Sequence, residues 1–265
     1  MATEGARATV TYDNAPVTEV VARFDLVDDL ELDIVNLVQL QAMWSDAYPE
    51  VTVVPAVERD SDVGSSGFQF HQGVPPIRIW AASGDGSFLV QTQGDMMMMN
   101  WRAKYSTAPY PRYSEVRRRL LETLSLLGEF QEARGRAVPQ VIGAGFDYYN
   151  RIQLADGEAP EDILNFVAST ETITGLAGTH VATTYQAEFE APPTPGDGML
   201  VSTTVRCVPA RSESGRALML SIATSALATN LDIPPTELLD RAHDISCQVF
   251  DRSIEPEYRT RWGRA

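Results

Sequence analysis

Strand-type alternation of apolar and polar residues constrains the fold of this chain more than any other sequence feature. In residues 181–190, Tyr185 and Phe189 alternate with Gln186 and Glu190. A period of two places one set of side chains on each face of a β-strand. Strand character of this kind also predicts strands at residues 17–26, 77–81, 88–93, 96–101, 139–154, 199–208 and 217–226.

Helix-type periodicity interrupts the strands four times. Val116, Leu120 and Leu127 recur at helical spacing in residues 113–134, which predicts a long helix there. Further helices are predicted at residues 30–48, 160–168 and 236–250. Because runs of strands and helices are grouped rather than strictly alternating, the fold class predicted is α+β, with an antiparallel sheet covered by helices.

The order of predicted elements repeats once along the chain. Each half reads strand, helix, three strands, helix, and the halves split near residue 137. No linker separates them, so we expect one domain with two half-units, 16–137 and 138–254, that share a sheet. Residues 1–15 and 255–265 are expected to be terminal tails.

Charge limits the partners that this protein can have. The 265 residues carry a formal net charge of -15, which argues against binding to nucleic acid or to an anionic membrane. Residues 1–50 have a net charge of -8 and residues 101–136 a net charge of +4. Complementary charge of this kind would favour a homodimer, and the alternative is that the basic residues form only a solvated helix face. The N-terminus has no apolar segment of the secretory type, so we expect a cytoplasmic protein.

The sequence Asn100-Trp101-Arg102 is the first candidate ligand site. Trp101 can stack on a planar ligand while the Arg102 guanidinium binds a carboxylate or phosphate. The alternative is structural: a packed tryptophan beside an arginine that is paired with an acid elsewhere in the fold.

A second candidate site lies on the strand predicted at residues 139–154. Asp147, Tyr149 and Arg151 share one face of that strand, where they would bind a polar ligand or form a cross-strand ladder. His243, inside the last predicted helix, is a candidate general base, although a structural hydrogen bond would account for it equally.

Searches for cofactor and metal motifs give a negative result. The sequence has no GxxxxGK[ST], GxGxxG, GxSxG or HExxH, and its cysteines and histidines lack metal-ligand spacing. We therefore expect neither a cofactor nor a metal.

Several short sequence motifs of this chain occur together in one bacterial family. They are QTQGD at 91–95, NWR at 100–102, YPRY at 110–113, YYNRI at 148–152 and AHD at 242–244. On these motifs the chain resembles a sporadically distributed bacterial family of uncharacterised proteins of about this length. The resemblance covers nearly the whole chain and bears on the fold, but it implies no activity.

Two functions follow as hypotheses. The first is a non-catalytic binding or accessory protein with a protein partner or a small-molecule ligand. Sporadic occurrence in the resembled family suits a mobile defence-type system. The alternative is a cofactor-free enzyme or small-molecule binder, with Arg102, Asp147, Tyr149, Arg151 and, as a further candidate, His243 around a polar pocket. An enzyme requires these residues to converge, whereas a binding protein requires an exposed patch.

Overall fold

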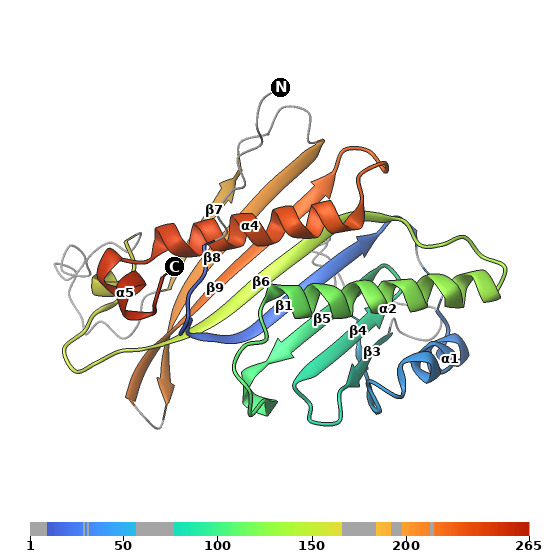
Figure 1. Ribbon diagram of the computed structural model, residues 1–265, viewed down its shortest axis with the longest axis horizontal. Helices are drawn as coiled ribbons and strands as arrows, with labels where there is room; N and C mark the ends of the chain where they lie inside the picture. The colour runs from blue at the N-terminus through green and yellow to red at the C-terminus, as the bar shows by residue number, and fades with distance from the viewer. Residues whose placement is uncertain are drawn as a thin grey trace, which may run out of the picture. The chain divides into compact units, whose positions relative to one another are not determined.

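The computed structural model describes residues 10–28, 30, 32–56, 77–165, 184–191, 198–212 and 215–264. These residues form helices and strands in a mixed α+β fold, as predicted (Figure 1). Their order is β1 (Val17–Leu26), α1 (Ile34–Trp44), β2 (Glu50–Pro55), β3 (Ile77–Ala82), β4 (Phe88–Gln93), β5 (Met96–Arg102), η2 (Ala103–Tyr105), α2 (Tyr113–Ala133), β6 (Val141–Gln153), α3 (Pro160–Ile163), β7 (Tyr185–Glu190), β8 (Met199–Ser212), β9 (Gly215–Ala228), α4 (Pro235–Ser253) and α5 (Pro256–Arg261).

The strands form a large antiparallel sheet. Strands β2 to β5 pair consecutively and antiparallel, and so do β7 to β9. Among the described residues the sheet order is β2-β3-β4-β5-β1-β6-β9-β8-β7. The predicted α+β class with an antiparallel sheet is therefore confirmed. The predicted strand at 181–190 is described from residue 184, and residues 181–183 lie outside the described residues.

Strand β2 is an addition to the predicted elements. It pairs with β3 in a register that places Val53 opposite Ile79. Its sequence, EVTVVP, has adjacent valines at Val53 and Val54 and therefore lacks the clean alternation by which the other strands were predicted. Within the described sheet β2 is a terminal strand, and most of its side chains are exposed.

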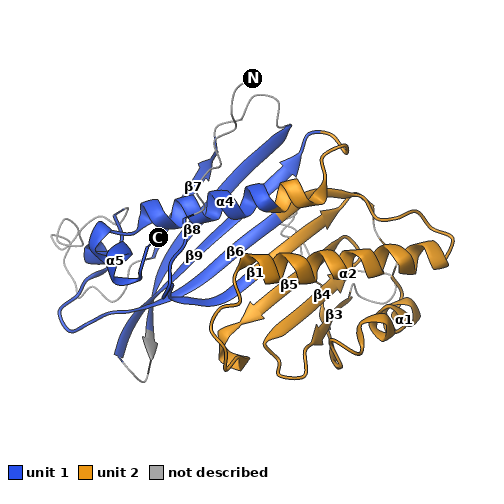
Figure 2. Cartoon of the chain, viewed as in Figure 1, with its two compact units in different colours: residues 1–20, 145–229, 240–265 blue, residues 21–144, 230–239 orange. Residues whose placement is uncertain are grey.

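The chain divides into two compact units (Figure 2). Unit 1 comprises residues 1–20, 145–229 and 240–265, and unit 2 comprises residues 21–144 and 230–239. The single domain with halves 16–137 and 138–254 stays a prediction. No helix in the described ranges is long and apolar enough to cross a membrane.

In unit 2, helix α2 lies across strands β3 to β5 (Figure 1). Its predicted stripe faces inward, because Val116, Leu120 and Leu127 are all fully buried. Helix α1 begins at Ile34 rather than at the predicted residue 30. The reason is the Asp33 side chain, which accepts a hydrogen bond from the Asn36 backbone N–H at 2.8 Å and so caps the helix.

In unit 1, helices α4 and α5 join strands β8 and β9 in one hydrophobic core. The described ends of the chain take part in this core, since Tyr12 forms a β-bridge with Arg264 and packs edge-on against Phe250. The core residues shared by these elements include Ile152, Leu154, Ile163, Val205, Cys207, Leu218, Leu220, Ile222, Phe250, Ile254 and Tyr258.

Candidate functional site

The sheet of unit 2 has one face toward α2 and one face away from it. The Arg119 guanidinium of α2 lies 4.0 Å from the centre of the Phe88 ring, so Phe88 faces the helix. Side chains alternate along β4, and Gln91 therefore lies on the opposite face. The register places Trp80 of β3 directly opposite Gln91, and Arg78 lies two residues before Trp80. Arg78, Trp80 and Gln91, here named the polar cluster, thus share the face remote from α2.

The polar cluster holds buried atoms that lack hydrogen bonds. Gln91 is 5% exposed, and its Nε2 donates to Asn100 Oδ1 at 2.7 Å. Within the described part of the chain, Arg78 Nε, Trp80 Nε1 and Gln91 Oε1 are buried and have no partner. The Arg78 guanidinium lies 5.5 Å from the centre of the Trp80 ring, and burial lowers the pKa of Arg78. The cluster therefore presents two donors and one acceptor beside an aromatic ring.

The predicted pair Trp101 and Arg102 does not act as one stacking site. Trp101 is opposite Phe88 in the register, is 3% exposed, and packs against Tyr110 with ring centroids 5.2 Å apart. The Arg102 Nη2 donates to the Gly86 carbonyl at 2.6 Å, and its guanidinium lies 4.4 Å from the centre of the Tyr105 ring. Trp101 is thus a packed side chain, and Arg102 is held at the end of β5.

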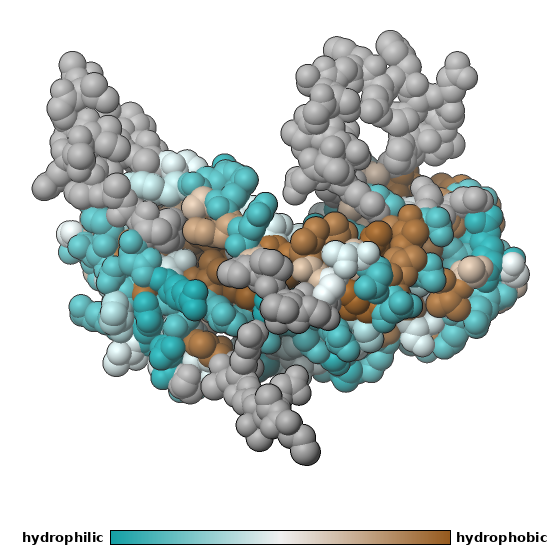
Figure 3. All heavy atoms as spheres, turned by 90° about the horizontal axis from the view of Figure 1, so that it is seen from above, coloured by the Kyte–Doolittle hydropathy of each residue, from teal (hydrophilic) through white to brown (hydrophobic). Residues whose placement is uncertain are grey.

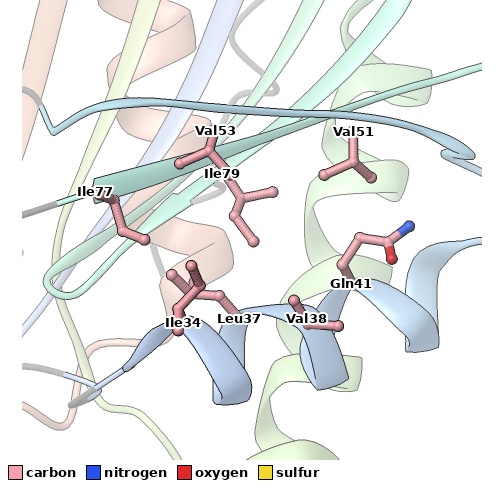
Figure 4. Close-up of a pocket in the computed structure, with 8 residues that line it drawn as sticks. All are labelled: Ile34, Leu37, Val38, Gln41, Val51, Val53, Ile77 and Ile79. Atoms are coloured by element: carbon pink, nitrogen blue, oxygen red, sulfur yellow. The ribbon is translucent and has the colours of Figure 1, made fainter.

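An apolar groove lies between α1 and strands β2 and β3 (Figure 4). Its cavity volume is about 60 Å³. Ile34, Val38, Val51 and Val53 are 58%, 61%, 42% and 53% exposed, so much of its wall is in contact with solvent. On the face drawn in Figure 3, hydrophobic residues are exposed in patches between hydrophilic ones. The full lining of the groove is Ile34, Leu37, Val38, Gln41, Val51, Val53, Ile77 and Ile79.

In unit 1 the predicted alternation along β6 is present. Tyr148 is buried, whereas Asp147 and Tyr149 are half-buried and Arg151 is exposed. The Thr18 hydroxyl donates to the Tyr149 carbonyl at 3.0 Å. Asp147, Tyr149 and Arg151 therefore share one face of β6, as expected.

His243 lies on the other face of β6. Its ring packs edge-on against Phe146, with centroids 5.1 Å apart. His243 Nε2 is 3.3 Å from Cys247 Sγ, and Nδ1 is 3.4 Å from Asp244 Oδ1. Burial lowers the pKa of His243, but the hydrogen bonds to Asp244 and Cys247 outweigh burial and raise it to about 9. A histidine that holds its proton at neutral pH is a poor general base.

The six predicted site residues are divided between the two units. Trp101 and Arg102 belong to unit 2 and the other four to unit 1, where His243 packs on the face of β6 opposite to Asp147. In the described ranges no group of three or more His, Cys, Asp or Glu side chains could hold a metal.

Two arrangements were not singled out from the sequence. Arg78 and Trp80 alternate with Ile77 and Ile79 in β3, which places them on the face of Gln91, but only the register shows that they meet. The apolar groove had one weak signal, a run of valines at residues 51–54 after a helix whose apolar residues exceed one face. Comparisons with known proteins add no constraint: no family model matches the chain, and no curated protein or solved structure is significantly similar to it.

Proposed function

We propose that this chain is a non-catalytic binding protein that docks a basic amphipathic helix of a partner protein in the apolar groove of unit 2. The observation that carries the proposal is the exposure of aliphatic side chains around a hollow. Contiguous apolar surface of this kind costs free energy in water and is typical of an interaction site.

Charge around the groove supports a basic partner. Residues 24–58, which include α1 and β2, contain eight acids and no Arg, Lys or His. Asp33 and Asp46 lie just before and just after α1. Glu50 begins β2 but, by the alternation of side chains, is on the face opposite to the lining residues Val51 and Val53. Arg78 adjoins the lining residue Ile77 in sequence, but it lies on the other face of the sheet. An apolar side chain flanked by Arg or Lys would therefore find complementary charge at the two ends of the α1 wall.

The shape of the groove supports a helix. The α1 wall presents Ile34, Leu37, Val38 and Gln41, which follow the i, i+3, i+4, i+7 spacing of one helix face. A partner helix with the same spacing packs its apolar ridge against such a wall. Trp101 is packed in the core rather than around a polar pocket, which agrees with the hypothesis that the motif residues have structural roles and that binding uses an exposed patch.

The test uses two labelled peptides that share one helical leucine pattern and carry either lysine or glutamate elsewhere. We expect fluorescence anisotropy to show at least tenfold tighter binding of the lysine peptide at low salt, and weaker binding as salt screens the charges. Val38→Asp should abolish binding. Val35→Asp is the matched control, because Val35 is on the same helix, is 59% exposed and does not line the groove.

Two results would contradict the proposal. Equal affinity for both peptides would remove the argument from charge, and unchanged binding by Val38→Asp would place the site elsewhere. Sedimentation of the protein alone separates a third case: a dimer that Val38→Asp dissociates would make a second copy of this chain the occupant.

We also propose that two related half-units build the fold, as the order of the predicted elements indicated. In addition, we propose that the chain belongs to the bacterial family that it resembles. The sheet order supports the first point. In the first half β1 neighbours β5, the last strand of the run β2–β5, and in the second half β6 neighbours β9, the last strand of the run β7–β9. In each half, the first strand therefore lies next to the last strand in the sheet.

A further inference from the structure

The face of β3–β5 remote from α2 holds polar atoms whose burial lacks compensation. Gln91 is more than nine-tenths buried, and its amide N–H group already donates to Asn100. The amide is therefore held in one orientation, which leaves Oε1 without a partner among the described residues, on the same face of the sheet as Arg78 Nε and Trp80 Nε1. Unpaired buried polar atoms are rare in native proteins, because a buried donor or acceptor that lacks a partner has lost its hydrogen bonds to water without replacing them.

The charges of this face favour an anion. Strands β3, β4 and β5 have the sequences IRIWAA, FLVQTQ and MMMMNWR, which contain no Asp or Glu. The nearest described carboxylate in sequence is Asp95, in the turn between β4 and β5, which accepts a hydrogen bond from Gln93 Nε2 at 3.0 Å. Arg78 is the positive charge nearest to Gln91 in the register, and its described contact is with the Trp80 ring. A partly buried guanidinium without a carboxylate partner is stabilised by any anion that reaches it.

We propose that the polar cluster binds a small carboxylate that carries a hydroxyl or amino group on the neighbouring carbon and an aliphatic side chain. The carboxylate oxygens accept hydrogen bonds from Arg78 Nε and Trp80 Nε1. The hydroxyl or amino group donates to Gln91 Oε1. This pairing satisfies all three atoms at once.

The aliphatic part of the ligand follows from the methionines of β5. Met98 is directly opposite Gln91 and Met96 is opposite Gln93, so both share the face of the polar cluster. They are 8% and 3% exposed. Methionine side chains are unbranched and adaptable, and they make room for an apolar group at low cost.

The experiment is isothermal titration calorimetry of the whole chain with three probes. They are 2-hydroxy-4-methylpentanoate, 4-methylpentanoate, which lacks the hydroxyl, and 4-methylpentan-2-ol, which lacks the carboxylate. We expect the hydroxy acid to bind at least tenfold more tightly than 4-methylpentanoate and the alcohol not to bind.

Variants separate the three hydrogen bonds. Trp80→Phe keeps a ring under Arg78 but removes the donor, and should weaken binding of the hydroxy acid about tenfold. Gln91→Leu removes the acceptor and should abolish the preference for the hydroxyl group. Trp44→Phe is the matched control, because Trp44 is buried and its Nε1 also lacks a partner, but it belongs to α1. Circular dichroism confirms that each variant is folded.

The proposal is overturned if none of the probes binds to the wild-type protein, or if Trp80→Phe and Gln91→Leu bind the hydroxy acid as the wild type does. Either result would indicate that ordered water, and not a ligand, forms hydrogen bonds with the three atoms. The groove is a separate site, so Val38→Asp should leave binding of the hydroxy acid unchanged, whatever its effect on the peptides.

Discussion

Arg119 of α2 is bound to three groups at once, whereas its neighbour Arg118 lies at the surface. The Arg119 guanidinium lies 4.0 Å from the centre of the Phe88 ring, its Nη1 donates to Tyr48 Oη at 3.4 Å, and its Nε donates to Glu115 Oε1 at 2.6 Å. Arg118 also binds Glu115, at 2.7 Å, but half of its side chain is exposed. The same carboxylate thus takes part in one inner and one outer ion pair.

These two arginines provide a matched pair of variants. Arg119→Ala should lower the free energy of unfolding by about 1–2 kcal/mol, because a partly desolvated cation–π contact and the packing of the alkyl chain are lost. Arg118→Ala should lower it by less than about 1 kcal/mol, as is usual for exposed ion pairs. Urea unfolding of both variants measures the difference. Equal effects would show that the contact with Phe88 adds no stability.

Glu115 also predicts a response to acid. The hydrogen bond from Arg118 lowers the pKa of Glu115, and burial raises it. The hydrogen bond from Arg119 lowers the pKa further, to about 2. A folded-state pKa below the unfolded value stabilises the protein above the unfolded pKa, near 4.3, and the stabilisation is lost as the pH falls toward 2. Unfolding measured at pH 7 and pH 3 should therefore show a smaller decrease for Glu115→Gln than for the wild type.

Trp101 should behave as a core residue. Trp101→Ala removes a side chain that is 3% exposed and packed on Tyr110, and we expect a loss of about 3–5 kcal/mol in the free energy of unfolding. Arg102→Gln should cost less, because it removes the bond to the Gly86 carbonyl and the contact with Tyr105 but leaves the core intact. Chemical denaturation measures both, and a Trp101→Ala protein with wild-type stability would contradict this packing role.

His243 predicts a pH dependence of the opposite sign. Its folded pKa, about 9, lies above the unfolded value near 6.5. The stabilisation, on the order of 2–3 kcal/mol, is fully present below pH 6.5 and is lost as the pH rises through 9. NMR titration of the His243 ring checks the pKa directly. In addition, the difference in stability between the wild type and His243→Gln should be largest near pH 6 and should shrink by pH 10.

The sequence predicted the strands and the long helices well because their side chains follow clear periods. Ala22, Phe24 and Leu26 alternate with Arg23 and Asp25 in β1, and the stripe of α2 needs only the 3.6-residue repeat. Strand β2 was missed because adjacent valines obscure its alternation and because it lies at the end of the described sheet, where burial does not enforce a pattern.

The candidate sites were harder to predict because they depend on register. Asp147, Tyr149 and Arg151 lie two residues apart on one strand, so their shared face followed from the sequence alone. Trp80 and Gln91 are eleven positions apart on different strands, and only the pairing of β3 with β4 brings them together. Whether Trp101 faces a ligand or the core likewise depends on where α2 packs. The sequence of β5 alone does not indicate that position.

The last prediction concerns Asp251, which is bound by residues near both ends of the chain. Tyr12 Oη donates to Asp251 Oδ1 at 2.7 Å, and Arg264 binds both oxygens of the same carboxylate. Burial raises the pKa of Asp251, but the bonds from Arg264 and Tyr12 outweigh it, so the pKa is below its usual value. The resulting stabilisation is present above about pH 4 and is lost as the pH falls through the folded pKa.

Tyr12→Phe separates this hydrogen bond from the packing of the ring. The edge-on contact with Phe250, at 5.2 Å between centroids, remains in the variant, so the expected loss is about 1–2 kcal/mol at pH 7, whereas Tyr12→Ala should cost about 3–5 kcal/mol. Asp251→Asn should make the free energy of unfolding less dependent on pH between 5 and 2. Asp156→Asn, at an exposed turn, is the control, and it should leave this pH dependence as it is in the wild type. If Tyr12→Phe and Asp251→Asn unfold at the same urea concentration as the wild type at every pH, the side-chain bonds to Asp251 add no stability. The two segments would then be held by apolar contact and by the backbone hydrogen bonds from Asp13 and Asn14 to residues 262–263.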